Sequence, residues 1–179
     1  MSLTEPLFFD TDCLSAFLWV KNESILARLY PGRVIIPREV YSELSNPCVS
    51  HLKTRIDALI SAGDAKLQDI IVGTPAYDFY RKLTAKPDGN HKIIGHGEAA
   101  AITLAKENCG IVASNNLRDI SVYIQELGLL HKTTGDILKD ALNAGIISIS
   151  HGETIWSNML KRRRKLGYSS FSDYLKANP

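Results

Sequence analysis

The hydrophobic residues of this chain follow two alternating patterns. Short runs of consecutive apolar residues, such as Leu7, Phe8 and Phe9, predict buried strands. Longer segments with apolar residues three or four positions apart, such as Leu52 and Ile56, predict helices. The predicted strands lie at residues 7–9, 33–36, 66–72, 111–113 and 129–132. The predicted helices lie at residues 14–20, 24–30, 38–44, 49–62, 74–83, 99–108, 119–127, 137–143, 153–165 and 170–176.

Strands that alternate with helices are typical of an α/β protein. We expect three layers, α/β/α, around a central and mostly parallel sheet of four to five strands. The 179 residues suit a single domain that can bury a proper core. We assign residues 1–150 to the main body of this domain and residues 151–179 to a C-terminal helical extension of it.

Several features of the composition exclude classes of protein. No apolar run approaches the ~20 residues that span a bilayer, and no basic region followed by a long apolar stretch marks a secretory signal. Cys13, Cys48 and Cys109 lie far apart and without CxxC spacing. We expect buried or incidental thiols in a reducing compartment, not a disulfide or zinc framework. The sequence therefore predicts a cytoplasmic protein with no membrane segment.

Positive charge is concentrated near the C-terminal end of the chain. The formal net charge of +2 is too small to identify a nucleic-acid-binding protein. The run of residues 161–165, however, contains five consecutive lysines and arginines. Such a run can bind RNA phosphates. It can equally be the solvated end of a helix, where the helix dipole favours cations.

Four acidic residues from separate segments could meet at one edge of the predicted sheet. Asp10 follows the first strand, and Asp119 follows the turn after the strand at 111–113. Glu98 begins a helix, and Glu43 lies late in another. Ligands of parallel sheets bind at the carboxyl ends of the strands. Clustered carboxylates repel one another unless a cation holds them together, and ligands that offer only oxygen suit Mg²⁺ or Mn²⁺.

Three of these four acids also have a local explanation. The helix dipole favours any acid in a first helical turn, which would account for Glu98 and Asp119. Glu43 could be a solvated helix residue, as we expect Glu39 to be.

Other titratable residues of these segments are also open to two interpretations. Asp10 has no capping partner visible in the sequence, whereas Asp12 is either a further ligand or the N-cap of the next helix. His91 and His96 flank the Glu98 segment and could contact a phosphate or transfer a proton. We interpret both histidines as loop residues.

Five segments in order resemble the PIN domain family: FFDTDCLSAF, IIPREVYSEL, GHGEAAAITLAKE, IVASNNLRDI and TTGDIL. The resemblance covers roughly residues 6 to 147. The SNNLRD segment is similar to that of ribonuclease toxins from bacterial toxin–antitoxin pairs. The GEAAAI segment and the helix after TTGDIL look more like PIN proteins known only as nucleic-acid-binding proteins.

The resemblance implies a metal-dependent endoribonuclease that acts on single-stranded RNA. Its implied cofactor is Mg²⁺ or Mn²⁺, and its implied partners are RNA, an antitoxin protein and a second copy of the chain. The implied metal-binding and catalytic residues are Asp10, Glu43, Glu98 and Asp119. The implied substrate-binding residues are Ser114, Asn115, Asn116 and Arg118.

One departure from the family pattern keeps other functions open. Asn115 and Asn116 stand where many relatives carry aspartate, and neutral oxygens bind a hard cation more weakly than carboxylates do. The alternative is a catalytically degenerate PIN fold that binds RNA or a protein. A phosphatase of the haloacid dehalogenase type ranks third. Asp10 and Asp12 imitate its D-x-D motif, but no pair of aspartates follows a later strand.

Overall fold

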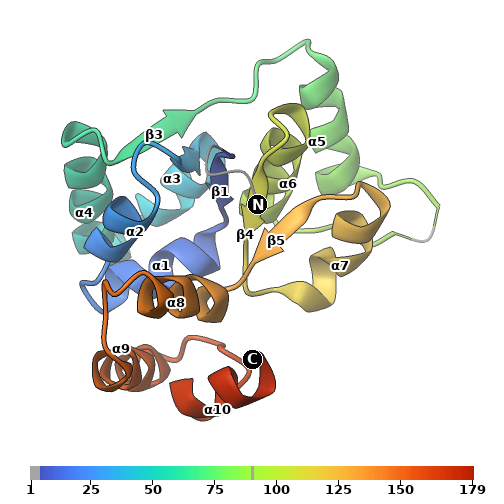
Figure 1. Ribbon diagram of the computed structural model, residues 1–179. Coiled ribbons are helices and arrows are strands. Elements are labelled where there is room, and N and C mark those ends of the chain that lie inside the picture. Colours follow the sequence, from blue (N-terminus) through green and yellow to red (C-terminus); the bar gives the residue numbers. More distant parts are fainter. Residues whose placement is uncertain (1–4, 90) are drawn as a thin grey trace.

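The computed structural model describes residues 5–89 and 91–179, and its centre is a parallel β-sheet (Figure 1). The spatial order of its strands is β3-β2-β1-β4-β5, and all neighbouring strands are parallel. Their bounds are β1 (Leu7–Phe9), β2 (Val34–Pro37), β3 (Ala65–Gln68), β4 (Ile111–Ala113) and β5 (Leu130–Lys132). The predicted α/β class, with a largely parallel sheet of four to five strands, is confirmed.

Helices cover both faces of this sheet (Figure 1). Those of the N-terminal half are α1 (Thr11–Trp19), α2 (Ser24–Leu29), α3 (Arg38–Leu44), α4 (Ser50–Ser61) and α5 (Pro75–Ala85), with a short 3-10 helix η1 (Pro47–Val49) before α4. Those of the C-terminal half are α6 (His96–Glu107), α7 (Leu117–Glu126), α8 (Thr134–Asn143), α9 (Ile149–Lys161) and α10 (Phe171–Ala177). None of the helices in the described ranges is long and apolar enough to cross a bilayer.

The central strand β1 divides the hydrophobic core into two parts. Leu7 and Phe9 point to one face, where they pack with α1–α4 and α8–α10. Phe8 points to the other face and packs with α5, α6 and α7. Successive side chains of a strand alternate between faces, and all three are fully buried. The central position of β1 thus places the residue after Phe9 between the two helical layers.

Several predicted boundaries are wrong, among them those of α1, α9 and β3, and side-chain caps explain where the two helices begin. Helix α1 begins at Thr11 instead of residue 14 because the side chain of Asp10 caps it. Helix α9 begins four residues early, capped by Ser148, and ends at Lys161, where the predicted helix continues to residue 165. Strand β3 ends at Gln68, four residues short of its predicted end at residue 72.

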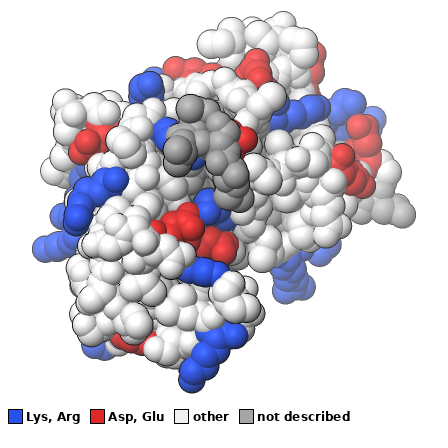
Figure 2. Space-filling model, viewed as in Figure 1, with Lys and Arg blue, Asp and Glu red and all other residues white. Residues whose placement is uncertain are grey.

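The C-terminal helices share the core of the main body. Trp156 of α9 and Phe171 of α10 are buried in the same cluster as Leu7. Helix α10 approaches α8 so closely that a Cβ on Gly135 would lie 2.4 Å from the ring of Tyr174. All three cysteines of the chain are free. On the face seen in Figure 2, basic and acidic side chains are interspersed.

Candidate active site

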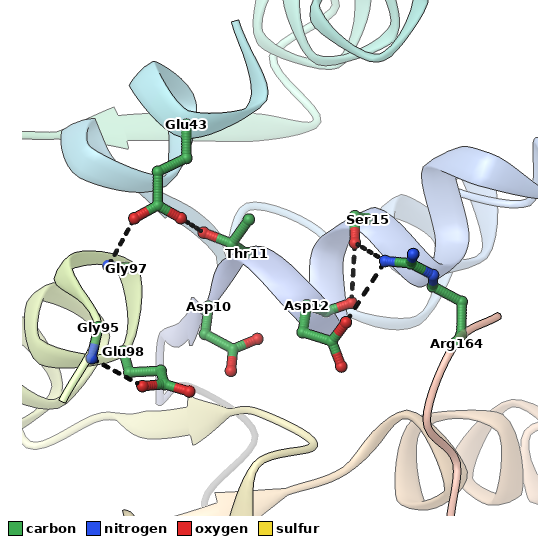
Figure 3. A pocket seen from close by; sticks show the side chains of 9 residues that line it. All are labelled: Asp10, Thr11, Asp12, Ser15, Glu43, Gly95, Gly97, Glu98 and Arg164. Atoms are coloured by element: carbon green, nitrogen blue, oxygen red, sulfur yellow. Dashed lines mark hydrogen bonds and ion pairs between the residues drawn. The ribbon is translucent and has the colours of Figure 1, made fainter. Parts of the chain in front are cut away.

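A pocket of about 240 Å³ opens at the carboxyl end of strand β1 (Figure 3). Four segments that are distant in sequence form its wall: the junction of β1 and α1, helix α3, the start of α6, and the chain after α9. Its lining residues are Asp10, Thr11, Asp12, Ser15, Glu43, Gly95, Gly97, Glu98 and Arg164. Three of the four acids that the sequence predicts to be ligands therefore line one pocket, and Asp119 does not.

Asp10 is the most buried acid of the pocket, with only 1% of its surface exposed. Its Oδ1 accepts a hydrogen bond of 2.7 Å from the backbone N–H of Cys13, which makes Asp10 the N-cap of α1. The expectation that Asp10 has no capping role is therefore wrong. Its Oδ2 is buried and has no hydrogen-bond partner among the described residues.

Burial raises the pKa of the Asp10 carboxyl to about 7. The hydroxyl of Ser114 and the amide of Cys13 act in the opposite direction, and the negative charges of Asp12 and Glu98 add to the rise. Neither the hydroxyl nor the amide carries a positive charge that would compensate the carboxylate. Near neutral pH, the Asp10 carboxyl is therefore protonated in part of the molecules and ionised in the rest. Only the ionised form attracts a cation.

Glu43 is fixed by the elements on both sides of it. Its Oε1 accepts a hydrogen bond of 3.2 Å from the backbone N–H of Gly97, and its Oε2 accepts one from the Thr11 hydroxyl. A Cβ on Gly97 would lie only 2.5 Å from Oγ1 of Thr11 and 3.2 Å from Oε2 of Glu43. The glycine that precedes Glu98 thus allows α6 to approach α1 and α3.

Glu98 and Asp119 are joined through the amide of Asn116. Glu98 Oε2 accepts from the backbone N–H of Gly95 at 3.0 Å, an interaction typical of an acid at the start of a helix. The Nδ2 of Asn116 donates to Glu98 Oε1 at 2.6 Å and to Asp119 Oδ2 at 2.8 Å. Asp119 does not line the pocket and is connected to Glu98 through Asn116.

The predicted substrate-binding residues have different placements. Asn115 connects strand β4 to helix α8, because its amide forms two hydrogen bonds of 2.9 Å with Thr134. Ser114 is buried, and its hydroxyl accepts from the backbone N–H of Asn116 at 3.1 Å. Arg118 is exposed on α7 and does not line the pocket. None of these four residues belongs to the pocket lining.

Asp12 and Arg164 form the opposite wall of the pocket (Figure 3). Asp12 lies in the first turn of α1, so it is not the N-cap that one interpretation of the sequence suggests. Nη1 of Arg164 donates to Oδ1 of Asp12 at 3.4 Å and to Oγ of Ser15 at 3.2 Å. Sequence reasoning missed Arg164, which is 152 positions from Asp12, and the only signal was its place in the basic run.

The remaining titratable residues of these segments lie outside the pocket lining. His91 pairs with Glu126, and His96 begins helix α6, where its Nδ1 is 2.7 Å from the hydroxyl of Tyr80. The interpretation of His96 as a loop residue is therefore wrong. Glu39 is half-buried, and burial raises its pKa, so the expectation of a solvated side chain is also wrong.

The chemistry of the pocket suits a hard divalent cation. The atoms that could bind a cation there are carboxylate and hydroxyl oxygens. One of them is the buried Oδ2 of Asp10, which has no hydrogen-bond partner among the described residues and which a cation would satisfy. Within residues 5–89 and 91–179, however, no three acidic, histidine or cysteine side chains stand close enough together to hold a metal ion as they are placed. A carboxylate has about four lone-pair sites, so the hydrogen bonds of Glu43 and Glu98 leave capacity for a further ligand.

Comparison with family models and with curated proteins gave no match to this chain. The resemblance to the PIN family therefore stays a prediction from the sequence motifs. Of the acids in these motifs, Asp10, Glu43 and Glu98 share a pocket, whereas Asp119 lies outside its lining and accepts a hydrogen bond from Asn116.

Proposed function

We propose that this protein is a divalent-metal-dependent endoribonuclease that cleaves single-stranded RNA at a PIN-like site. The observation that carries the proposal is the buried Oδ2 of Asp10, which has no hydrogen-bond partner among the described residues and lies in a pocket with three further acids, Asp12, Glu43 and Glu98. Burying a carboxylate in this way is costly unless a positive charge compensates it. Bound Mg²⁺ or Mn²⁺ would supply Lewis-acid stabilisation of phosphate charge.

The residues of the chain would have distinct roles in this reaction. Asp10, Glu43 and Glu98 would hold the ions. Thr11 and the backbone of Gly97 would orient Glu43, since they donate to both of its oxygens. Outer contacts of this kind fix the direction of ligand side chains. Asp119 would act through Asn116, which it shares with Glu98.

The similarity of the SNNLRD segment to ribonuclease toxins supports a more specific role. In this role the protein is a cytoplasmic toxin, with RNA as its substrate, an antitoxin protein as its inhibitor and a second copy as a dimer partner. A neighbouring reading frame that encodes a small DNA-binding protein would support this assignment. A solitary gene would favour the nuclease without the antitoxin.

Two glutamates of helix α3 provide a matched test of the nuclease. Glu39 and Glu43 are one turn apart, but only Glu43 lines the pocket. We expect Glu43→Gln to lower kcat/KM for single-stranded RNA at saturating Mg²⁺ by more than the roughly 10–100-fold that losing an outer contact of a metal site typically costs. Glu39→Gln should leave the rate nearly unchanged. If Glu39→Gln is the inactive variant, the acids of the site are wrongly assigned.

A second candidate function is a non-catalytic module that binds RNA or a protein, and the contacts of two side chains favour it. The amide of Asn116 donates to both Glu98 and Asp119, and Arg164 donates to Asp12. The chain thus supplies internal donors where a cation would otherwise be needed. Calorimetric titration with Mn²⁺ separates the two proposals, because a binding module has no need of the metal. Nuclease activity that appears only in Asn116→Asp would favour the module.

A further inference from the structure

Helix α9 ends at Lys161, the first residue of the basic run at 161–165. The rest of the run leaves the helix and turns back. Arg163 adopts a left-handed backbone with φ of 59°. The N–H of Arg163 bonds to the carbonyl of Leu160 at 2.8 Å, and that of Arg164 bonds to the carbonyl of Met159 at 3.0 Å. This pair of bonds is a Schellman motif, which reverses the chain at the end of a helix. The residues after Arg163 consequently return toward α1.

Arg162 and Arg164 of this run contact helix α1 at two successive turns. The guanidinium of Arg162 lies 5.6 Å from the ring centre of Trp19, at the last residue of α1. The guanidinium of Arg164 contacts Ser15, four residues earlier, and Asp12 at the pocket. Residues four apart on a helix are neighbours on one face. The two arginines therefore follow α1 from its end to the acidic pocket.

A second hollow of about 410 Å³ lies at the Trp19 end of this path. Its lining contains three cations and no acid. The lining residues are Trp19, Val20, Lys21, Asn158, Lys161 and Arg162. Lys21, Lys161 and Arg162 are exposed, so their charged groups are accessible to a ligand. We call this hollow the α1/α9 groove.

We propose that the α1/α9 groove binds the single-stranded RNA strand that leads away from the phosphate in the acidic pocket, an inference that rests on the proposed function. The three cations match the charge of successive phosphates. The guanidinium of Arg162 over Trp19 presents a flat surface on which an unpaired base can stack. Arg164 lines the acidic pocket and is two residues after Arg162 of the groove. Its Nη2 donates to none of the described residues and is free for the intervening phosphate.

Two neighbouring arginines allow a matched test with a labelled ten-nucleotide RNA. Arg162→Gln and Arg163→Gly each remove one charge from the same run, but only Arg162 lines the groove. Glycine also accepts the left-handed backbone of Arg163 without strain. By fluorescence anisotropy in EDTA, we expect Arg162→Gln to weaken binding about tenfold and to lower the salt slope by about 0.7. Arg163→Gly should change the affinity less than about twofold.

Further measurements separate a failure of the groove from a failure of the nuclease. Lys21→Asn removes another cation of the groove and should weaken RNA binding as much as Arg162→Gln does. Because Lys21 is not the residue that lies over Trp19, this variant distinguishes a loss of charge from a structural change at Trp19. Equal losses in Arg162→Gln and Arg163→Gly would overturn the groove, as would a parent protein that does not bind the RNA. RNA cleavage whose KM is unaffected by Arg162→Gln would overturn the groove alone. Binding that depends on Arg162 without any cleavage would retain the groove and overturn the nuclease.

Discussion

Asp10 combines a structural and a chemical role in one carboxyl group. One oxygen caps helix α1, and the other is buried without a partner among the described residues. The sequence predicted the position of this acid at the end of a strand but not the cap. A run of three apolar residues followed by aspartate is equally compatible with either role. In the structure Asp10 has both roles, because α1 begins directly after it.

The raised pKa of Asp10 makes the stability of the metal-free protein depend on pH. The carboxyl binds a proton more tightly in the folded state, at a pKa of about 7, than at its ordinary value of 3.8. Its favourable contribution is therefore complete below about pH 4 and is lost as the pH rises through 7. Asp10→Asn keeps a capping oxygen and cannot ionise. In EDTA at pH 8, we expect urea unfolding to show this variant a few kcal/mol more stable than the parent.

Asp10→Ala is the control for this measurement. Alanine also removes the charge but loses the cap, which costs about 1 kcal/mol. It should therefore gain less stability at pH 8 than Asp10→Asn does. A parent protein whose stability stays constant between pH 5 and 8 would contradict the pKa of Asp10.

At the scale of elements, the hydrophobic periodicity predicted which segments are helices and strands. It did not predict where α1 begins or where α9 ends. The start of α1 depends on the side chain of Asp10, and the end of α9 depends on the left-handed backbone of Arg163. Arginine rarely adopts this conformation, so no local signal marked the end of the helix. The position of the basic run beside α1 was therefore not predictable from the sequence.

The packing of α6 against α1 and α3 leads to a test at Gly97. Alanine would favour the helix by up to about 1 kcal/mol, but its Cβ would lie 2.5 Å from Oγ1 of Thr11. Steric overlap of this kind typically costs about 1–3 kcal/mol. We expect Gly97→Ala to lower the free energy of unfolding and to displace Glu43. Gly95→Ala is the control, because its Cβ would meet only the flexible carboxylate of Glu98, at 3.2 Å. Greater stability of Gly97→Ala than of Gly95→Ala would refute the close approach.

At the scale of the whole molecule, the candidate site is assembled from segments that lie far apart in the chain. Asp10, Glu43, Glu98 and Arg164 come from four different segments. The three acids could be selected from the sequence because each belongs to a short motif and because parallel strands share one carboxyl edge. Arg164 could not, since its contact with Asp12 depends on the packing of the C-terminal helices against the main body.

We expect Mn²⁺ to raise the melting temperature of the whole protein. A cation that binds only the folded state at a hundredfold excess over its Kd contributes about 2.7 kcal/mol. For a domain of this size, that corresponds to a rise in Tm of about 5–10 °C. The rise should be larger at pH 8 than at pH 6, because a proton on Asp10 competes with the cation near its pKa of about 7. Asp10→Asn should lose most of the rise at both pH values. A melting curve that is indifferent to millimolar Mn²⁺ would favour the non-catalytic module, in which Asn116 donates to Glu98 and Arg164 donates to Asp12 in place of a cation.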